Sequence, residues 1–180
     1  MHIQLSKQGN LSRIRTKSII KHLYLLTKDS YHHLHHRRDH FVKVVTDYIN
    51  ISTKGNTDIH DITSEATRLV EASGLNSGTA TIFVHGSTGA VTTIEYESGL
   101  VEDMKRMLER VAPQGIEYRH NLRWGDGNGH SHIRASLLGP SLTVPFQNNR
   151  LMLGTWQQII FIDLDNKPRN RDVIVQIMGV

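Results

Sequence analysis

The sequence predicts an α+β domain of mostly antiparallel β-sheets, sandwich-like or barrel-like, with two main helices. Short β-rich runs separated by turn residues predict the strands, and two longer runs with apolar residues at helical spacing predict the helices. Roughly seven strands are expected. They include residues 42–51, 79–85, 90–95, 141–145, 155–164 and 172–178.

Both expected helices carry start or stop signals. Asp61 or Thr63 can cap the first helix, and Gly74 is placed to end it. Its inner face is Ile62, Ala66, Leu69 and Val70. The second helix ends before Pro113, since proline cannot continue a helix. Its apolar residues are Leu100, Val101, Met104, Met107, Leu108 and Val111, and we interpret the two methionines as core rather than as part of a cofactor site.

Composition bounds the function. The chain has 180 residues and no cysteine, which excludes disulfides, thiolate zinc sites and a cysteine nucleophile. No apolar run is long enough to span a bilayer, and the N-terminus lacks the apolar region of a signal peptide. We therefore expect a cytoplasmic protein with no membrane partner.

The positive charge is confined to the first segment. Residues 1–41 hold eight Lys/Arg, two Asp/Glu and seven of the twelve histidines, whereas residues 42–180 hold thirteen Lys/Arg and fifteen Asp/Glu. We predict that 1–41 is a basic, His-rich extension, disordered or non-native, and that 42–180 is a single domain. Val42 could be a misread GTG start. A metal-binding or nucleic-acid-binding tail is the alternative, and nucleic acid is not the expected partner.

The run from His120 to His132 is the most informative part of the chain. It contains three histidines, an aspartate, two asparagines and three glycines in thirteen residues. Imidazoles and carboxylates are ligands of divalent metals and also acid–base groups, so the run predicts a metal or phosphate site. Its spacing matches no standard zinc signature, and a solvated loop is the alternative. In an extended segment His130 and His132 would share a face and Ser131 would point away.

Three further features are candidates. Glu95 ends a predicted strand. The alternatives for its role are a metal ligand, a base and a surface residue. His85 precedes the turn Gly86-Ser87-Thr88-Gly89, which could bind an anion or simply join a hairpin. Gly154-Thr155-Trp156-Gln157 could stack and hydrogen-bond a heterocycle, or Trp156 could fill the core or a subunit contact.

These residues resemble a known family. The run His130-Ser131-His132-Ile133, the segment Leu138-Gly139-Pro140-Ser141 to Pro145, and Gly154-Thr155-Trp156-Gln157 closely resemble the YjbQ-like family, which is also labelled secondary thiamine-phosphate synthase and is otherwise uncharacterised. The resemblance covers about residues 42–180. It implies a cytosolic homotrimer of small α+β domains with a polar cleft near the subunit contacts, in which a divalent metal, zinc or magnesium, is expected.

The resemblance also implies an activity and residue roles. The activity is that of a transferase joining a pyrimidine diphosphate to a thiazole phosphate with release of pyrophosphate. The implied catalytic residues are Glu95, His120, Asp126 and His132, of which His120, Asp126 and His132 would also hold the metal. The implied substrate-binding residues are Asn128, Ser131, Ser141, Thr155, Trp156 and Gln157. The alternative is a homotrimer that binds metal or a small anion without catalysis.

One departure from the family pattern concerns a histidine after the first hairpin strand. Aligned back from Glu95, that position is Gly86, and His85 lies one place early. A shift of one residue in a strand turns a side chain to the opposite face. We therefore do not assign the family histidine's role to His85.

Overall fold

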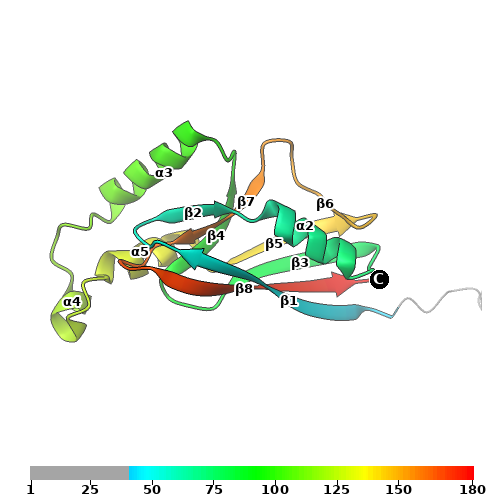
Figure 1. Ribbon diagram of the computed structural model, residues 1–180, viewed down its shortest axis with the longest axis horizontal. Helices are drawn as coiled ribbons and strands as arrows, with labels where there is room; N and C mark the ends of the chain where they lie inside the picture. The colour runs from blue at the N-terminus through cyan, green and yellow to red at the C-terminus, as the bar shows by residue number, and fades with distance from the viewer. Residues whose placement is uncertain (1–40) are drawn as a thin grey trace, which may run out of the picture. The chain divides into compact units, whose positions relative to one another are not determined.

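Eight strands form two antiparallel sheets in the computed structural model, which describes residues 41–180 (Figure 1). The larger sheet has the order β1-β8-β3-β5-β6 and the smaller β2-β7-β4. The strands are β1 (Lys43–Thr53), β2 (Asp58–Asp61), β3 (Ser77–Val84), β4 (Gly89–Ile94), β5 (Ser141–Gln147), β6 (Arg150–Leu151), β7 (Gln158–Asp163) and β8 (Arg169–Gly179). The predicted α+β class with mostly antiparallel sheets is confirmed. The expectations for residues 1–40 lie outside the described residues.

The described residues contain four helices, two of which were predicted. The helices are α2 (Thr63–Ala72), α3 (Ser98–Val111), α4 (Arg119–Trp124) and α5 (Gly129–Leu138). Neither predicted residue occupies the N-cap of α2, which is Ile62, but Asp61 Oδ1 accepts a hydrogen bond from the Thr63 N–H, the first of the helix, at 2.9 Å. Strands β2 and β6 and helices α4 and α5 were not predicted. None of the helices in residues 41–180 has the length and apolarity needed to cross a membrane.

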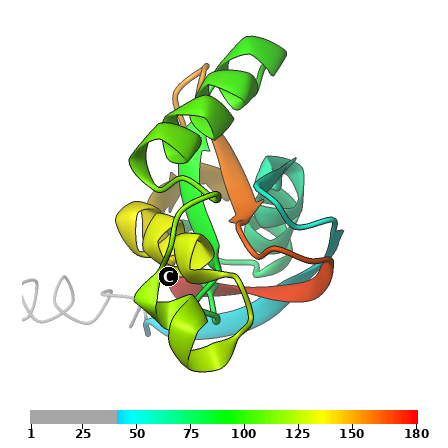
Figure 2. The ribbon, with the colours of Figure 1, turned by 90° about the vertical axis from the view of Figure 1, so that its left-hand side faces the viewer.

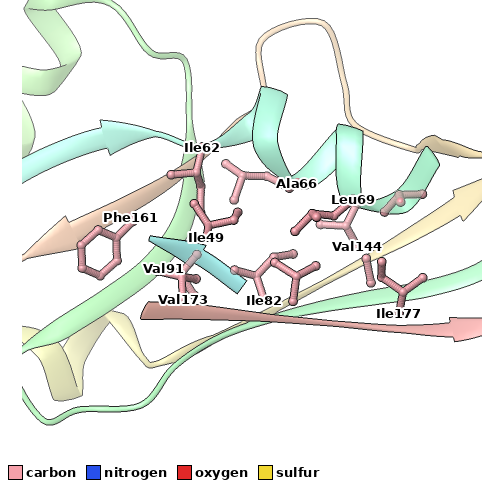
Figure 3. Packing of buried hydrophobic residues seen from close by; sticks show 14 of the residues in the cluster. Ile49, Ile62, Ala66, Leu69, Ile82, Val91, Val144, Phe161, Val173 and Ile177 are labelled. Atoms are coloured by element: carbon pink, nitrogen blue, oxygen red, sulfur yellow. The ribbon is translucent and has the colours of Figure 1, made fainter. Parts of the chain in front are cut away.

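The main core lies between α2 and the two sheets (Figure 3). Alternate residues of β1, β3, β5 and β8 point inward, as the two-residue period of a strand requires. Residues Ile62, Ala66, Leu69 and Val70 of α2 pack onto them, so the predicted inner face of this helix is confirmed.

The three-stranded sheet is buried on both faces. Ile159 and Phe161 of β7 belong to the main core, whereas Ile160 and Ile162 belong to a second core formed with α3 and α5. Figure 2 shows α5 and α2 on opposite sides of this sheet. Burial on both faces explains why β7 is a continuous apolar run rather than an alternating one. Met104 and Met107 pack against the second core, as predicted.

Candidate functional site

Helices α4 and α5 and the loop between them carry the histidine-rich run. Gly125 ends α4 with φ of 69°, a left-handed conformation that favours glycine. The Asn121 side chain then accepts a hydrogen bond from the Gly129 N–H at 2.8 Å, at the start of α5. A Cβ on Gly129 would lie 2.5 Å from Cβ of Tyr118, so only glycine fits there. Two glycines thus bring the ends of α4 and α5 together.

Four polar side chains of this run meet at one point. His120 Nε2 lies 3.4 Å from Asp126 Oδ2, and the rings of His120 and His132 have centroids 4.4 Å apart. With the Asn128 amide oriented to satisfy its neighbours, its nitrogen donates to the two Asp126 oxygens at 3.1 and 3.2 Å and lies 3.1 Å from His120 Nε2. The structure therefore brings together His120, Asp126, Asn128 and His132, which we call the histidine cluster.

His130 and Ser131 are buried and do not belong to the histidine cluster. The prediction that His130 and His132 share a face was wrong, because the run forms helix α5, where residues two apart are separated by roughly 200°. His130 is 1% exposed, with its Nε2 3.3 Å from the Ser131 hydroxyl and its Nδ1 without a hydrogen-bond partner among residues 41–180. Ser131 is 0% exposed, and its predicted contact with substrate stays a prediction.

Two buried carboxylates lie at the end of β7 and in the turn that follows it. Asp163 continues the inward face of Ile159 and Phe161, so its side chain enters the end of the core. Arg171 donates to its two oxygens at 3.0 and 2.7 Å, and Thr53 Oγ1 donates to it at 2.5 Å. Sequence reasoning missed this role of Asp163, although an aspartate at the end of a buried apolar strand was a signal.

The second buried carboxylate, Asp165, connects the turn to the histidine cluster. It accepts hydrogen bonds from Arg169 Nε at 2.6 Å and from the Asn166 N–H at 2.8 Å. The next residue, Asn166, donates to the Asp126 backbone oxygen at 2.7 Å. The turn therefore fixes the loop residue Asp126 through Asn166.

Burial and neighbouring charges set the protonation of the cluster. Burial and the nearby His120 lower the pKa of His132, outweighing Asp126 and Asp165. Burial tends to raise the pKa of Asp165, but hydrogen bonds from Arg169 and the Asn166 N–H outweigh it and hold the pKa below its usual value. At neutral pH the site therefore contains a neutral His132 imidazole, able to accept a proton, above a charged carboxylate.

The predicted metal ligands lie together and have suitable chemistry, but their ligand atoms do not surround a common ion position. Imidazole and carboxylate groups are usual ligands of zinc. In residues 41–180, however, no three His, Asp or Glu side chains are arranged to hold an ion, and the nearest donors of His120 and Asp126 face each other. The divalent ion stays a prediction of the sequence, and metal analysis of the full-length protein tests it.

The remaining predicted site residues lie at the opposite end of the three-stranded sheet. In β4, Gly89 pairs with Asp163 below the cluster, and Glu95 follows the far end of the strand. Six residues of strand separate these ends by about 20 Å. Thr155, Trp156 and Gln157 lie in the loop before β7, beside Glu95; both connections are at the top of Figure 1, whereas α4 is at its lower left.

No hydrogen bond within residues 41–180 joins Ser141 or the turn after His85 directly to the histidine cluster. Ser141 is exposed at the start of β5, where it pairs with Phe83. Thr88 of the turn is buried, and its hydroxyl accepts a hydrogen bond from Arg171 at 2.9 Å. This turn therefore positions the arginine that neutralises Asp163. His85 itself is exposed.

Comparison with known proteins gives one consistent family. The family model for UPF0047 protein YjbQ-like matches residues 47–180. A UPF0047 protein of Methanothermobacter thermautotrophicus is 41% identical over 139 residues, covering 77% of this chain and 95% of that protein. UPF0047 protein YugU of Bacillus subtilis is 34% identical over 133 residues, covering 73% and 97%.

A solved structure supports the same assignment. A YbjQ-like protein of unknown function from Sulfolobus solfataricus has a TM-score of 0.74 and 35% identity, covering 78% of this chain and all of that one. Its fold and that of the present chain therefore agree over the domain that carries the histidine cluster. The chain belongs to the UPF0047, YjbQ-like family.

Proposed function

We propose that the histidine cluster is the active site of an enzyme that acts on a small phosphorylated molecule. The observation that carries the proposal is the contact between two half-buried imidazoles, His120 and His132, with Asp126 beside one of them. Carboxylate–imidazole pairs orient a ring for proton transfer, and the neutral second ring can accept a proton. The first reaction to test is the one implied by the family resemblance, synthesis of thiamine phosphate.

That reaction makes definite demands on the site. A carbon–nitrogen bond forms between the pyrimidine methylene and the thiazole ring while the carbon–oxygen bond to the diphosphate breaks. Negative charge develops on the departing pyrophosphate, so donors aimed at it stabilise the transition state. In the proposed site an imidazole N–H of the His120–His132 pair is that donor. The carboxylates of Asp163 and Asp165 pair with Arg171 and Arg169 of β8.

The test is turnover by the full-length protein with a pyrimidine diphosphate and a thiazole phosphate. We expect thiamine phosphate and pyrophosphate in equal amounts, and a loss of roughly 100-fold or more in kcat for His120→Ala and for His132→Ala. His60→Ala is the matched control, since His60 is half-buried and pairs with Asp58 at 2.9 Å outside the cluster. Absence of product with the unaltered protein would refute this reaction.

A non-catalytic anion-binding or metal-binding role is the second candidate. It would use the residues of the histidine cluster without turnover. Thermal melting with pyrophosphate separates the two functions. A raised melting temperature that depends on His132, without any turnover, would support binding alone.

We also propose that the chain acts as a homotrimer. The implied site residues form two groups about 20 Å apart in one chain, so they can act on one substrate only across a subunit contact. Trp156 is 68% exposed, and an aromatic side chain so exposed often marks a contact surface. The core role considered for Trp156 is therefore wrong, and the subunit-contact role is the one proposed.

The outer face of the five-stranded sheet is a suitable surface for that assembly. Its central three rows contain no charged residue, and α2 covers only the opposite face. The rows are Val44, Met178, Thr79 and Pro145; Thr46, Gln176, Thr81 and Thr143; and Tyr48, Ile174, Phe83 and Ser141. An uncharged face of this kind is typical of the centre of a protein interface.

Measurement of mass in solution tests the trimer. Light scattering should give three times the chain mass of 20.4 kDa. Met178→Glu, at a position 49% exposed on this face, should reduce the mass, whereas Val111→Glu, at a position 57% exposed on α3, should not. A monomer at micromolar concentration would contradict the proposal.

A cytoplasmic location is proposed on the absence of cysteine and on the family resemblance. Cell fractionation of the untagged protein tests it. Recovery of the chain outside the cytoplasmic fraction would contradict it.

A further inference from the structure

An exposed tryptophan lies beside the histidine cluster on the same helix. His120 and Trp124 are four residues apart in α4 (Arg119–Trp124), so their side chains lie on the same face of that helix. His132, in turn, has its ring 4.4 Å from that of His120. Trp124 is 65% exposed although it is a large apolar group next to polar ones. Such exposure next to a candidate site indicates a surface for a ligand.

The neighbouring arginine adds a cation to this surface. The guanidinium carbon of Arg123 lies 5.5 Å from the centroid of the Trp124 ring, within the range of a cation–π contact. Arg169 and Arg171 are held by buried carboxylates, whereas Arg123 has no carboxylate at ion-pair distance anywhere in residues 41–180. Arg123 is therefore a cation near the cluster whose charge is available to an anion, and it is the one that contacts Trp124.

We propose that Trp124 is the platform on which the heteroaromatic ring of the substrate stacks, with Arg123 binding a phosphate of the same molecule. The inference rests on the proposed function and deepens it, since it names the substrate class as a planar heteroaromatic ring that carries phosphate. Within one chain Trp124 replaces Trp156 in the stacking role, because Trp156 lies at the far end of the three-stranded sheet.

Calorimetry tests the inference by measuring the affinity of the full-length chain for two ligands. One is a pyrimidine diphosphate, and the other is pyrophosphate, which lacks a ring. Trp124→Ala should weaken binding of the pyrimidine diphosphate roughly tenfold and leave pyrophosphate binding unchanged, because stacking on an aromatic side chain is lost. Arg123→Ala should weaken binding of both ligands. Leu122→Ala, at a position 68% exposed on the same helix, is the matched control and should change neither.

Tryptophan fluorescence gives an independent readout, since the chain contains only Trp124 and Trp156. Addition of the pyrimidine diphosphate should quench the tryptophan fluorescence of the Trp156→Phe variant, which retains Trp124. If the ligand quenched the fluorescence only of the Trp124→Phe variant, which retains Trp156, the inference would be overturned.

Equal affinity of Trp124→Ala and the unaltered chain for the pyrimidine diphosphate would also overturn the inference. Failure of the unaltered chain to bind either ligand would overturn both the inference and the proposed function. Ring-dependent binding through Trp124 without formation of thiamine phosphate would support the inference and refute only the proposed reaction.

Discussion

Replacement of Arg171 by methionine should destabilise the protein strongly. Asp163, its partner, is 0% exposed, and Arg171 is 15% exposed. Three hydrogen bonds hold the guanidinium: two to the Asp163 carboxylate, at 2.7 and 3.0 Å, and one to Thr88 Oγ1, at 2.9 Å. Methionine keeps much of the apolar stem but removes every donor. The carboxylate would then remain buried with only the Thr53 hydroxyl as a side-chain partner.

The magnitude follows from the burial of that charge. Removal of one partner of a buried ion pair costs about 3–5 kcal/mol, mostly because the other charge stays buried without compensation. For a protein of this size each kcal/mol lowers Tm by roughly 2–4 °C, so a fall of about 6–20 °C is expected. The double variant Arg171→Met with Asp163→Asn removes both charges. Its cost should be smaller than the sum of the two single costs by about 1–3 kcal/mol.

The assay is urea unfolding of the full-length protein, followed by circular dichroism. Arg106→Met is the control, because Arg106 and its partner Glu102 are 68% and 54% exposed and such a pair contributes about 1 kcal/mol or less. The reasoning is refuted if Arg171→Met costs no more than Arg106→Met. It is also refuted if the costs of the Arg171 and Asp163 substitutions are simply additive.

Two further predictions concern the α4–α5 region. Gly129→Ala should destabilise the protein by about 1–3 kcal/mol, because the new Cβ would lie 2.5 Å from Cβ of Tyr118. Gly115→Ala is the control. A Cβ on Gly115 meets nothing within 4 Å, so this substitution should be nearly neutral in the same unfolding assay. The pKa of His132 should lie below the ordinary 6.5, and NMR titration of its ring protons measures it. The unfolded chain then binds a proton more readily than the folded one. The free energy of unfolding should therefore fall as pH drops through 6.5. A His132 pKa at or above 6.5 would contradict this. The depressed pKa of Asp165 acts in the same direction at lower pH, because its stabilisation is present above the ordinary 3.8 and is lost as pH falls through its folded value.

Most of the sheet framework was predictable because its pattern is local. Alternating residues in β1 and β8 and the apolar stripe of α2 each follow one period over many residues. Strand β2 has four residues and β6 only two, too few to establish a period. These short strands exist because longer strands pair with them, which is a property of the tertiary structure.

Helix α5 was missed for a different reason. Its apolar Ile133 and Leu137 are 47% and 60% exposed, whereas the polar His130 and Arg134 are buried. Arg134 can be buried because Ala112, Thr57 and Glu109 accept its hydrogen bonds. The hydrophobic pattern of this helix is therefore inverted, and a reading that places apolar residues inside cannot detect it.

The candidate site was only partly predictable, because some of its residues come together only in the tertiary structure. The sequence indicated His120, Asp126, Asn128 and His132, because they lie close together in a glycine-rich run. Asp163 and Asp165 become part of the site only through the pairing of β7 and β8 with their neighbours. Conversely, Glu95 and Trp156 match the family pattern but are separated from the cluster by the length of β4. Spacing along the chain could not reveal either fact.

The distribution of charge explains why a ligand is expected at α4 rather than at the β7–β8 turn. Arg171 is half-buried and Arg169 is exposed, but Asp163 and Asp165 neutralise them, so an incoming anion would have to displace a carboxylate. On α4 no such competition exists for Arg123, and the half-buried His120 and His132 offer ring nitrogens beside it. The two pairs therefore stabilise the β7–β8 turn, whose Asn166 donates a hydrogen bond to Asp126, and in the proposed function the exposed groups of α4 and α5 recognise the substrate.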